Sequence, residues 1–415
     1  MFSDDALNSE AVLQLETRDR HLATEIVYGT LRWQALLDYI LGSASTRPWD
    51  EVAPGAKVLL RMSLYQMWRL NRIPEYALVN DAVELAKMDL GKGIDSFING
   101  ILRRLTRTHP WKNEPILQNA PEWIRASLPN WLWDRWSARY GENTAMEFAL
   151  SLNSPPQPAL RLAAADQGPD ALQFAVTESN LVPGAYIPSA GITESKPELK
   201  DAAAFQIQDE ASQLIPHLLK PLPGWKVWDT CAAPGGKSAI LSKLCGEAGR
   251  VVASDLRNAR IGRMLQFLRN AGAGNTDVLI ADACRPSPFR TCFDAVLVDV
   301  PCSGLGTLRR NPEIKWSFQP QDFTALQETQ KKILHNASDS VRIGGRLLYS
   351  TCSTEPEENE HVIRSFLDAH SGFRLIQPDY PSGIELWTKP DLMVRTFPSR
   401  HLWDGFFAAL MTRHF

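Results

Sequence analysis

Two cysteines carry the strongest signal for chemistry in this chain, because each closely follows a run of apolar residues. Cys302 stands in FDAVLVDVPCSGLG and Cys352 in GGRLLYSTCSTEPEENE. Both runs predict strands of one sheet, and the carboxyl ends of parallel strands meet at the edge where such sheets bind ligands. A lone cysteine is usually a small buried hydrophobic residue. Two cysteines at strand ends instead indicate a pair of thiols facing one pocket, where a thiolate can serve as a nucleophile.

A strand, a glycine-containing loop and the start of a helix are indicated by KVWDTCAAPGGKSAILSKL. Glycines let the backbone approach a ligand closely, and this loop differs from the GxGxxG pattern of dinucleotide-binding enzymes. The next two predicted strands end near Asp255, which suits ribose hydroxyls, and Asp282, which suits an adenine amino group. The candidate cofactor-binding residues are these two acids together with Cys231, Ala232, Ala233, Pro234, Gly235, Gly236, Lys237 and Asp299.

The region after Asp201 supplies the elements that would position these residues. Short apolar runs alternate with helical segments, which predicts an α/β fold with a seven-stranded, Rossmann-like, doubly wound sheet. One helix is predicted at 322–341, and another is expected to begin near Glu357 and Glu358, where carboxylates suit the helix dipole. The predicted strands are 226–230, 250–254, 277–281, 293–300, 345–353, 393–397 and 405–412.

The first 110 residues show instead the 3.6-residue period of amphipathic helices, which predicts a small helical bundle. Residues 109–156 mix prolines with tryptophans and indicate a structured connector, while residues 158–200 predict a small mixed subdomain. We therefore expect a helical domain at 1–140, a connector with a small α+β subdomain at 141–200, and a domain at 201–415 that holds the candidate catalytic residues. The apolar stripe that best shows the helical period consists of Ile94, Phe97, Ile98, Ile101, Leu102 and Leu105.

Composition narrows the class of protein further. Six cysteines without a CxxC pair argue against a disulfide framework and a zinc site, so no metal is expected. No apolar run approaches the ~18 residues of a membrane span and no signal peptide is evident, which predicts a cytoplasmic protein without membrane attachment. The net charge of −3 argues against a generally basic nucleic-acid binder, but it leaves room for a local cationic patch.

Several strings, taken together, resemble one known family. DTCAAPGGK, SDLRNARI, DVPCSGLGTLRRNPEIKW and YSTCSTEPEENE resemble the motifs of the RsmB (Sun, or Fmu) family of rRNA cytosine-C5 methyltransferases. FQIQDEASQL and the closing GFFAALMTR extend the resemblance, and EIVYGTLRW with INGILRRL resembles the family's NusB-like amino-terminal domain. The resemblance implies an S-adenosylmethionine-dependent methyltransferase domain preceded by an all-α NusB-like domain. It also implies 16S rRNA as substrate, at a site of the cytosine-967 type.

Two departures from the family pattern stand out. The LRLAAAD stretch at Leu160 lacks the asparagine that usually follows such an arginine. The chain is also expected to begin inside the first helix of the NusB-like domain, which leaves open whether the natural start lies upstream of Met1.

The resemblance also implies roles for individual residues. Cys352 is expected to be the nucleophile that adds to C6 of cytosine, and Cys302 to assist removal of the C5 proton and release of the base. The reverse assignment is the main alternative, because the cysteine of the PC motif is the nucleophile in analogous DNA enzymes. Asp299 is expected to hold the cytosine edge or a cofactor amino group, and Lys237 to shape the cofactor loop or contact RNA phosphate. Positive charge close to the pocket suffices to neutralise phosphates, and the expected RNA contacts of this kind are Arg309, Arg310 and Lys315.

Two other functions stay open at this point. One is a tRNA cytosine-C5 methyltransferase of the same fold. The other is a non-catalytic RNA-binding assembly or antitermination factor with a vestigial methyltransferase domain, against which the intact cysteines argue. The expected partner is small-subunit rRNA, unassembled or partly assembled, and the chain is expected to act as a monomer.

Overall fold

A computed structural model describes residues 3–70, 73–91, 93–112, 117–162, 174–189, 205–379, 391–401 and 403–415. The chain divides into two compact units. The first comprises Met1–Ser154 and Arg309–Ser317, and the second comprises Pro155–Leu308 and Phe318–Phe415. These boundaries differ from the predicted domains at 1–140, 141–200 and 201–415. The predicted connector is shared between the units, and a short segment of the predicted catalytic domain belongs to the first.

The first unit is built of helices around one apolar core. In the helix at Ile94–Thr108, Ile98, Ile101, Leu102 and Leu105 are buried, which confirms the predicted amphipathic stripe. The helices are α1 Ser3–Leu7, α2 Glu10–Leu13, α3 Thr17–Arg32, α4 Gln34–Ala44, α5 Pro54–Arg69, α6 Glu75–Asp89, α7 Ile94–Thr108, α9 Glu122–Arg125, α10 Asn130–Tyr140, α11 Glu142–Leu152 and α15 Ile314–Ser317, with short 3-10 turns at Trp49–Glu51 and Pro110–Lys112.

The segment Arg309–Ser317 is part of the interior of this helical unit. Its Lys315 is fully buried, and the ammonium donates hydrogen bonds to the main-chain oxygens of Arg32 and Ser127, each at 3.2 Å. A third hydrogen bond reaches Asn153 Oδ1 at 2.5 Å. The lysine therefore ties together segments that are far apart in the sequence.

The second unit contains a twisted sheet with the strand order β10-β12-β9-β8-β5-β6-β7, and β11 pairs with β12. Strands β5 to β9 run parallel to one another, whereas β12 is antiparallel to β9, β10 and β11. The strand order reverses between β5 and β8, and ligands bind at such a switch point in doubly wound sheets. The predicted fold class is thus confirmed, but the described part of the sheet has eight strands and not the predicted seven, because β10 was not predicted. The strands are β5 Lys226–Asp229, β6 Arg250–Asp255, β7 Thr276–Ile280, β8 Phe293–Asp299, β9 Val341–Thr351, β10 Phe373–Leu375, β11 Val394–Arg395 and β12 Phe407–Arg413.

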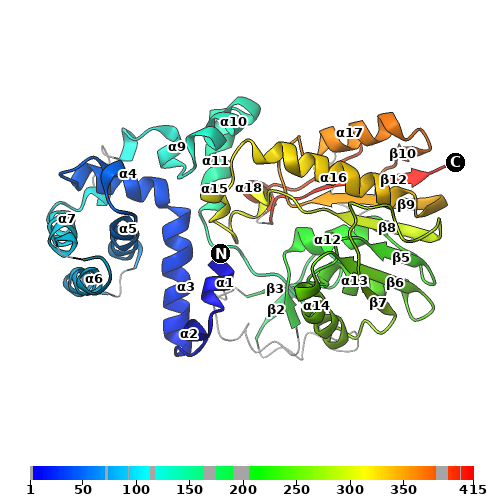
Figure 1. Ribbon diagram of the computed structural model, residues 1–415, viewed down its shortest axis with the longest axis horizontal. Helices are drawn as coiled ribbons and strands as arrows, with labels where there is room; N and C mark the ends of the chain where they lie inside the picture. Colours follow the sequence, from blue (N-terminus) through cyan, green and yellow to red (C-terminus); the bar gives the residue numbers. More distant parts are fainter. Residues whose placement is uncertain are drawn as a thin grey trace. The chain divides into compact units, whose positions relative to one another are not determined.

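Helices cover both faces of this sheet, as Figure 1 shows. Side chains alternate between the faces along β8: Leu297 packs in the core under one helical layer, while Val296 and Val298 pack under the other. Contrary to the prediction, Glu357 and Glu358 precede the helix after β9 instead of forming its first turn. One layer consists of α12 Glu210–Leu219, α13 Gly236–Cys245 and α14 Asn258–Asn270, and the other of α16 Asp322–Ser338 and α17 Glu360–Ala369; a short helix, α18, spans Pro398–His401.

A small antiparallel sheet precedes the large one in the chain. Its strand order is β2-β3-β1-β4, and Leu160 and Phe205 form its buried core. The last strand, β4, leads into α12, whose first turn is capped because Ala211 donates its main-chain N–H to the Asp209 side chain at 2.9 Å. This connection carries Gln208 to the edge of the large sheet. The strands are β1 Leu160–Leu162, β2 Val176–Glu178, β3 Ala185–Pro188 and β4 Phe205–Ile207.

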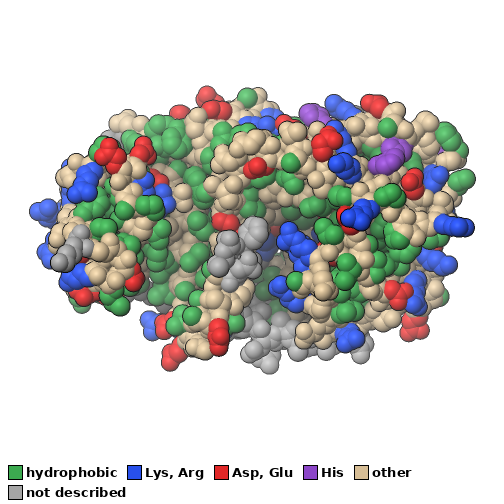
Figure 2. Space-filling model, viewed as in Figure 1, with side chains coloured by type: hydrophobic (Ala, Val, Ile, Leu, Met, Phe, Trp, Pro, Cys, Tyr) green, Lys and Arg blue, Asp and Glu red, His purple; other side chains and the backbone are tan. Residues whose placement is uncertain are grey.

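Charges of both signs are interspersed over the face drawn in Figure 2, as expected for a net charge of −3. Within the described segments no helix combines the length and the apolar character that a bilayer crossing requires. The same segments contain no cluster of three or more histidine, cysteine, aspartate or glutamate side chains arranged to hold a metal ion.

Candidate active site

The loop between β5 and α13 depends on two glycines. Gly235 has φ of 109°, a conformation that side chains rarely adopt, and a Cβ there would lie 3.1 Å from the ring of Phe267. A Cβ on Gly236 would lie 3.2 Å from the amide of Gln208. The glycines thus let the loop pass close to both side chains, and the predicted close approach to a ligand stays a prediction.

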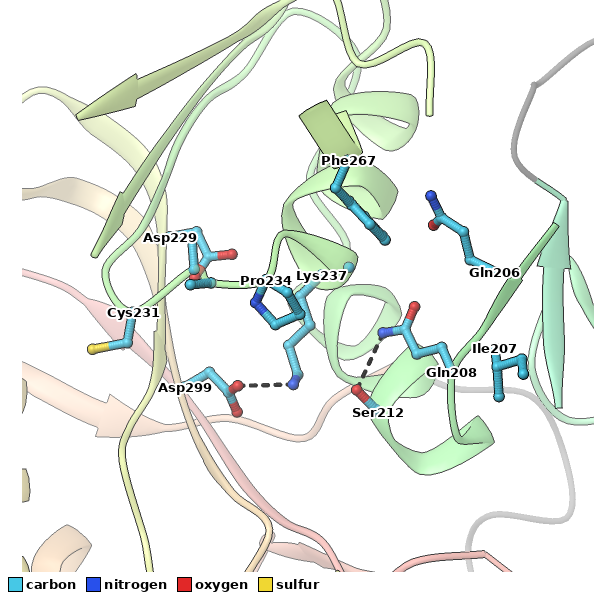
Figure 3. A pocket seen from close by; sticks show the side chains of 13 residues that line it. Gln206, Ile207, Gln208, Ser212, Asp229, Cys231, Pro234, Lys237, Phe267 and Asp299 are labelled. Atoms are coloured by element: carbon cyan, nitrogen blue, oxygen red, sulfur yellow. Dashed lines mark hydrogen bonds and ion pairs between the residues drawn. The ribbon is translucent and has the colours of Figure 1, made fainter. Parts of the chain in front are cut away.

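This loop forms one wall of a pocket at the switch point of the sheet. Figure 3 shows Asp229 and Asp299 on one side of the pocket, and Gln206 and Gln208 on the other. Of the predicted cofactor residues, the pocket brings together Cys231, Ala232, Ala233, Pro234, Gly236, Lys237 and Asp299. The lining residues that were not predicted are Gln206, Ile207, Gln208, Ser212, Asp229 and Phe267.

Asp229 is the most notable of the unpredicted residues. It ends β5, is 1% exposed, and accepts a hydrogen bond from Ser238 Oγ at 2.6 Å. Its other carboxylate oxygen is buried without a hydrogen-bond partner among the described residues. Burial raises the pKa of Asp229 to about 7. A ligand that brings a hydrogen-bond donor or a positive charge would satisfy this oxygen.

Lys237 and Asp299 form a second polar contact in the pocket. The lysine Nζ lies 2.8 Å from Asp299 Oδ2, and Ser350 Oγ donates to Asp299 Oδ1 at 2.7 Å. The Lys237 ammonium also lies 5.4 Å from the centre of the Phe406 ring. Burial opposes the charge of Lys237, but the neighbouring Asp299 carboxylate outweighs it and raises the lysine pKa. Lys237 is therefore a pocket residue and not a solvated residue at a helix start.

The two predicted cysteines lie side by side. Cys302 follows β8, Cys352 follows β9, and their Sγ atoms are 3.1 Å apart. The hydrogen bond with Cys352 and burial raise the pKa of Cys302. The Lys237 ammonium interacts electrostatically with Cys352. Two thiols in contact beside a cation form an arrangement suited to thiolate chemistry.

The backbone around the thiols is locked by two glycines. Gly306 donates its N–H to the Cys352 carbonyl at 3.0 Å, and its own carbonyl accepts the N–H of Gly405 at 2.8 Å. A Cβ on Gly306 would lie 1.9 Å from the Gly405 oxygen. The loops after β8 and β9 and the residues before β12 are therefore held in one arrangement.

The two strand-end acids do not line this pocket. Asp255, the last residue of β6, is 7% exposed and accepts the N–H of Arg257 at 2.9 Å. Asp282 lies two residues beyond β7 and accepts the N–H of Cys284 at 2.9 Å. Their positions at the carboxyl edge are those expected, but their predicted contacts to ribose and adenine stay predictions.

The predicted RNA contacts after the PC motif need correction. Lys315 is fully buried, and its ammonium is taken up by protein oxygens. Arg309 is 3% exposed, and its carbonyl accepts a hydrogen bond from Arg32 at 2.8 Å. Arg310 is partly buried. Arg309 and Lys315 are therefore interior residues of the helical unit, because the segment that carries them folds into that unit.

Comparison with known proteins decides the family. The model of the 16S rRNA methyltransferase RsmB/F family matches residues 216–412, and that of the NusB family matches residues 1–107. A probable ribosomal RNA small subunit methyltransferase B of Bacillus subtilis (strain 168) is 33% identical, over 96% of this chain and 92% of the relative. The chain belongs to the ribosomal RNA small subunit methyltransferase B family.

Further relatives agree with this family. The ribosomal RNA small subunit methyltransferase B of Thermus thermophilus is 32% identical, over 95% of this chain and 89% of the relative. The crystal structure of PH0851 superposes with a TM-score of 0.78 at 25% identity, covering 96% of this chain and 91% of that one. The chain is therefore an RNA methyltransferase, and its cofactor is S-adenosylmethionine.

The pocket fits this cofactor. The ammonium group of S-adenosylmethionine would provide the hydrogen-bond donor that the buried oxygen of Asp229 lacks. The two glycines leave room for the ligand to approach the backbone of the loop. Gln206 and Gln208 were missed although FQIQDEASQL resembles a family segment, because resemblance alone did not place that strand against the sheet edge.

Proposed function

We propose that this member of the family methylates C5 of a cytosine in 16S rRNA, at a site of the cytosine-967 type, through a covalent bond between Cys352 and C6 of the base. One observation carries the proposal. The thiols of Cys302 and Cys352 are 3.1 Å apart at the carboxyl edge of the sheet, and Lys237 of the adjoining pocket interacts with Cys352.

The arrangement of residues suits the difficulty of the reaction. Cytosine C5 is a weak nucleophile, so addition of the Cys352 thiolate to C6 makes the ring enamine-like and allows C5 to take a methyl group. S-adenosylmethionine, when bound, supplies that methyl group from a positively charged sulfur. Transfer of the C5 proton to a base then lets the C6–S bond break, which returns the Cys352 thiolate and leaves 5-methylcytosine.

The surroundings of the two thiols support Cys352 as the nucleophile. The Lys237 ammonium interacts electrostatically with Cys352, and a nearby cation is a common feature of reactive cysteines. The hydrogen bond with Cys352 and burial raise the pKa of Cys302, so Cys302 keeps its proton longer. Once Cys352 is bonded to the base, its charge and that hydrogen bond are lost. Cys302 then gives up its proton to water more readily, and the resulting thiolate can accept the proton from C5 and become a thiol again.

Substitution of each cysteine tests the proposal. Cys352→Ala should bind RNA yet form neither product nor adduct, because no C6–S bond can form. Cys302→Ala should allow attack and methyl transfer but stall before release, so a protein–RNA complex should survive denaturing electrophoresis when cofactor is present. An adduct from Cys352→Ala and none from Cys302→Ala would reverse the roles. Near-normal turnover in both variants would exclude the cysteine mechanism.

The substrate is tested separately from the chemistry. Labelled cofactor offered with unmodified 16S rRNA and, in parallel, with tRNA should label the rRNA. Label in tRNA alone would favour the tRNA enzyme of the same fold, and RNA binding without any transfer would favour the assembly factor. Mapping 5-methylcytosine in rRNA from cells with and without the gene would identify the nucleotide.

A further inference from the structure

We infer that Glu358 is a positioning residue that holds the two cysteine loops together and, through its negative charge, keeps Cys302 protonated while Cys352 attacks. The inference deepens the proposed function and rests on it for the roles of the thiols. Glu358 lies in the turn before α17, away from the pocket lining, and it is fully buried.

The carboxylate of Glu358 bridges the residues that directly follow the two cysteines. Ser303, next to Cys302, donates its N–H at 2.8 Å and its hydroxyl at 2.6 Å. Ser353, next to Cys352, donates its hydroxyl at 2.5 Å, and the two serine hydroxyls lie 3.1 Å apart. One side chain therefore restrains both loops, and with them the separation of the thiols.

Glu358 is itself held at its side chain and at its main chain. Gln330 of α16 donates its amide to the Glu358 carboxylate at 3.0 Å, and Tyr349 of β9 donates its hydroxyl to the Glu358 main-chain carbonyl at 2.5 Å. Asn359 accepts from the Thr351 hydroxyl at 2.6 Å and donates to the Ser353 carbonyl at 2.9 Å. Because the backbone is fixed in this way, a shorter side chain at 358 would not reach the serines.

All four donors to this carboxylate are neutral, so the carboxylate presents a net negative charge to its surroundings. That charge is one of the causes that raise the pKa of Cys302, after the hydrogen bond with Cys352 and burial. Burial also raises the pKa of Glu358, against the effect of its donors. The other ionisable groups facing this region are Tyr349, Asp299 and, on the side of Cys352, Lys237.

The two halves of the site therefore carry opposite charges. The Lys237 ammonium interacts with Cys352, whereas the Glu358 carboxylate disfavours the thiolate of Cys302. Two chemically identical side chains in contact thus have neighbours of opposite charge. The chain achieves this with one residue from the cofactor loop and one from the turn after β9.

The test measures the thiol of Cys302 directly, without RNA or cofactor. In a Cys352→Ser background, the rate of iodoacetamide alkylation at Cys302 is followed against pH by peptide mass spectrometry, which separates it from the exposed Cys284 and Cys292. With Glu358 intact, the profile should lie above that of an ordinary thiol, near pH 8.5. Glu358→Gln keeps the shape and removes the charge. It should shift the profile down by about one unit, which is about tenfold faster alkylation at pH 7.5.

Two matched variants separate charge from shape. Glu357→Gln makes the same charge change one residue away and should leave the profile of Cys302 unchanged. Ser303→Ala removes a hydroxyl donor but keeps the Glu358 charge, so it should not shift the profile downward. The same downward shift in Ser303→Ala as in Glu358→Gln would assign the effect to loop geometry and overturn the role of the charge.

The inference about Glu358 can be overturned without overturning the proposed function. A Cys302 profile at or below that of an ordinary thiol with Glu358 intact would overturn it, even if Glu358→Gln did not fold. An unchanged profile in a folded Glu358→Gln variant would do the same. Because no substrate is present, these outcomes are independent of the adduct patterns that test the proposed function. In the methylation assay, Glu358→Gln should lower turnover at unchanged cofactor affinity, while Glu357→Gln should retain turnover.

Discussion

Each compact unit contains a fully buried charged side chain whose hydrogen-bond partners are neutral. In the helical unit, Lys315 donates to two main-chain carbonyls and to Asn153. In the second unit, Glu358 accepts from two serines and Gln330. The lysine joins helices that are distant in sequence, whereas the glutamate joins two loops that carry thiols. The same physical device thus stabilises architecture in one region and controls reactivity in the other.

Burial shifts the pKa values of Lys315 and Glu358 in opposite directions, because in both cases it favours the neutral form. It lowers the pKa of Lys315 to about 7, with the nearby Arg32 guanidinium adding to the effect. It raises the pKa of Glu358, where the hydrogen bonds from Ser303 and Ser353 oppose it. Above about pH 7, the pH dependence of stability should therefore report on the helical unit, and that of thiol reactivity on the second unit.

The largest effect is expected where backbone contacts leave no space. Gly306→Ala would place a methyl group 1.9 Å from the Gly405 oxygen and 2.9 Å from the Cys352 oxygen. The loops must then move, so methyl transfer should fall more than about 100-fold. Gly262→Ala is the control, because nothing lies within 4 Å of its added Cβ. Normal turnover in Gly306→Ala would contradict the prediction, because it would show that the loops after β8 and β9 can move without loss of activity.

Removal of the other buried charge should affect stability instead of chemistry. Lys315→Met leaves Asn153 and two carbonyls without their donor, which should lower the free energy of unfolding by about 3 kcal/mol. In the natural chain, the unfolded state binds the lysine proton up to pH 10.5 and the folded state only up to about 7. The unfolded state binds more protons between these values, so stability should rise with pH across this window, and Lys315→Met should abolish the rise.

Denaturant unfolding between pH 7 and pH 10 measures this prediction. Lys57→Met is a control of the same chemistry at a half-buried position of α5, where the ammonium bonds a single main-chain oxygen, and it should change little. An unaltered pH dependence in Lys315→Met would show that Lys315 keeps its proton in the folded chain.

A third substitution tests whether the cofactor site includes the carboxyl end of β6. Asp255→Ala should weaken S-adenosylmethionine by about 1 to 3 kcal/mol if the carboxylate accepts ribose hydroxyls. The fold should persist, because Asp255 lies at a strand end and not within the core of the sheet. Calorimetric titration of the folded variant measures the affinity, and an unchanged value would remove Asp255 from the cofactor site.

The smallest effect concerns the orphaned oxygen in the pocket. Asp229 has a folded pKa of about 7 against an ordinary value of 3.8, so the folded state binds more protons between these values and stability should fall as pH rises across them. Asp229→Asn should remove that fall and be more stable than the natural chain at pH 8. Its cofactor affinity should drop about tenfold, or about 1.4 kcal/mol, because the amide carries no charge. Thermal unfolding with and without cofactor measures both, and lower stability at pH 8 would contradict the prediction.

The sequence predicted the large sheet and the thiol pair because both depend on local patterns. Apolar runs marked β5, β6 and β8, and Cys302 and Cys352 follow such runs. The carboxyl ends of parallel strands lie at the same edge of the sheet, and this placement does not depend on contacts made elsewhere in the chain. The residues of the glycine loop were predicted for the same reason.

Residues whose role depends on distant contacts were not predicted. Lys315 has the appearance of a solvated cation, and only the return of its segment into the helical unit buries it. Glu358 was assigned to a helix start by its spacing, but its carboxylate turns inward to the serines. Asp229 was passed over because nothing local distinguishes a buried carboxylate from one that ends a strand in solvent.

The interruption of the helical unit affects how the chain can be made. Its interior includes Lys315, which the ribosome adds 161 residues after Ser154. At translation rates of about 5 to 20 residues per second, Lys315 is synthesised about 10 to 30 seconds after Ser154. During that time the oxygens of Ser127 and Asn153 lack the ammonium that joins them. The amino-terminal helices therefore emerge first but reach their final packing late, after strands β5 to β8 of the large sheet have been synthesised. An amino-terminal fragment that ends at Ser154 would never acquire the hydrogen bonds that Lys315 donates.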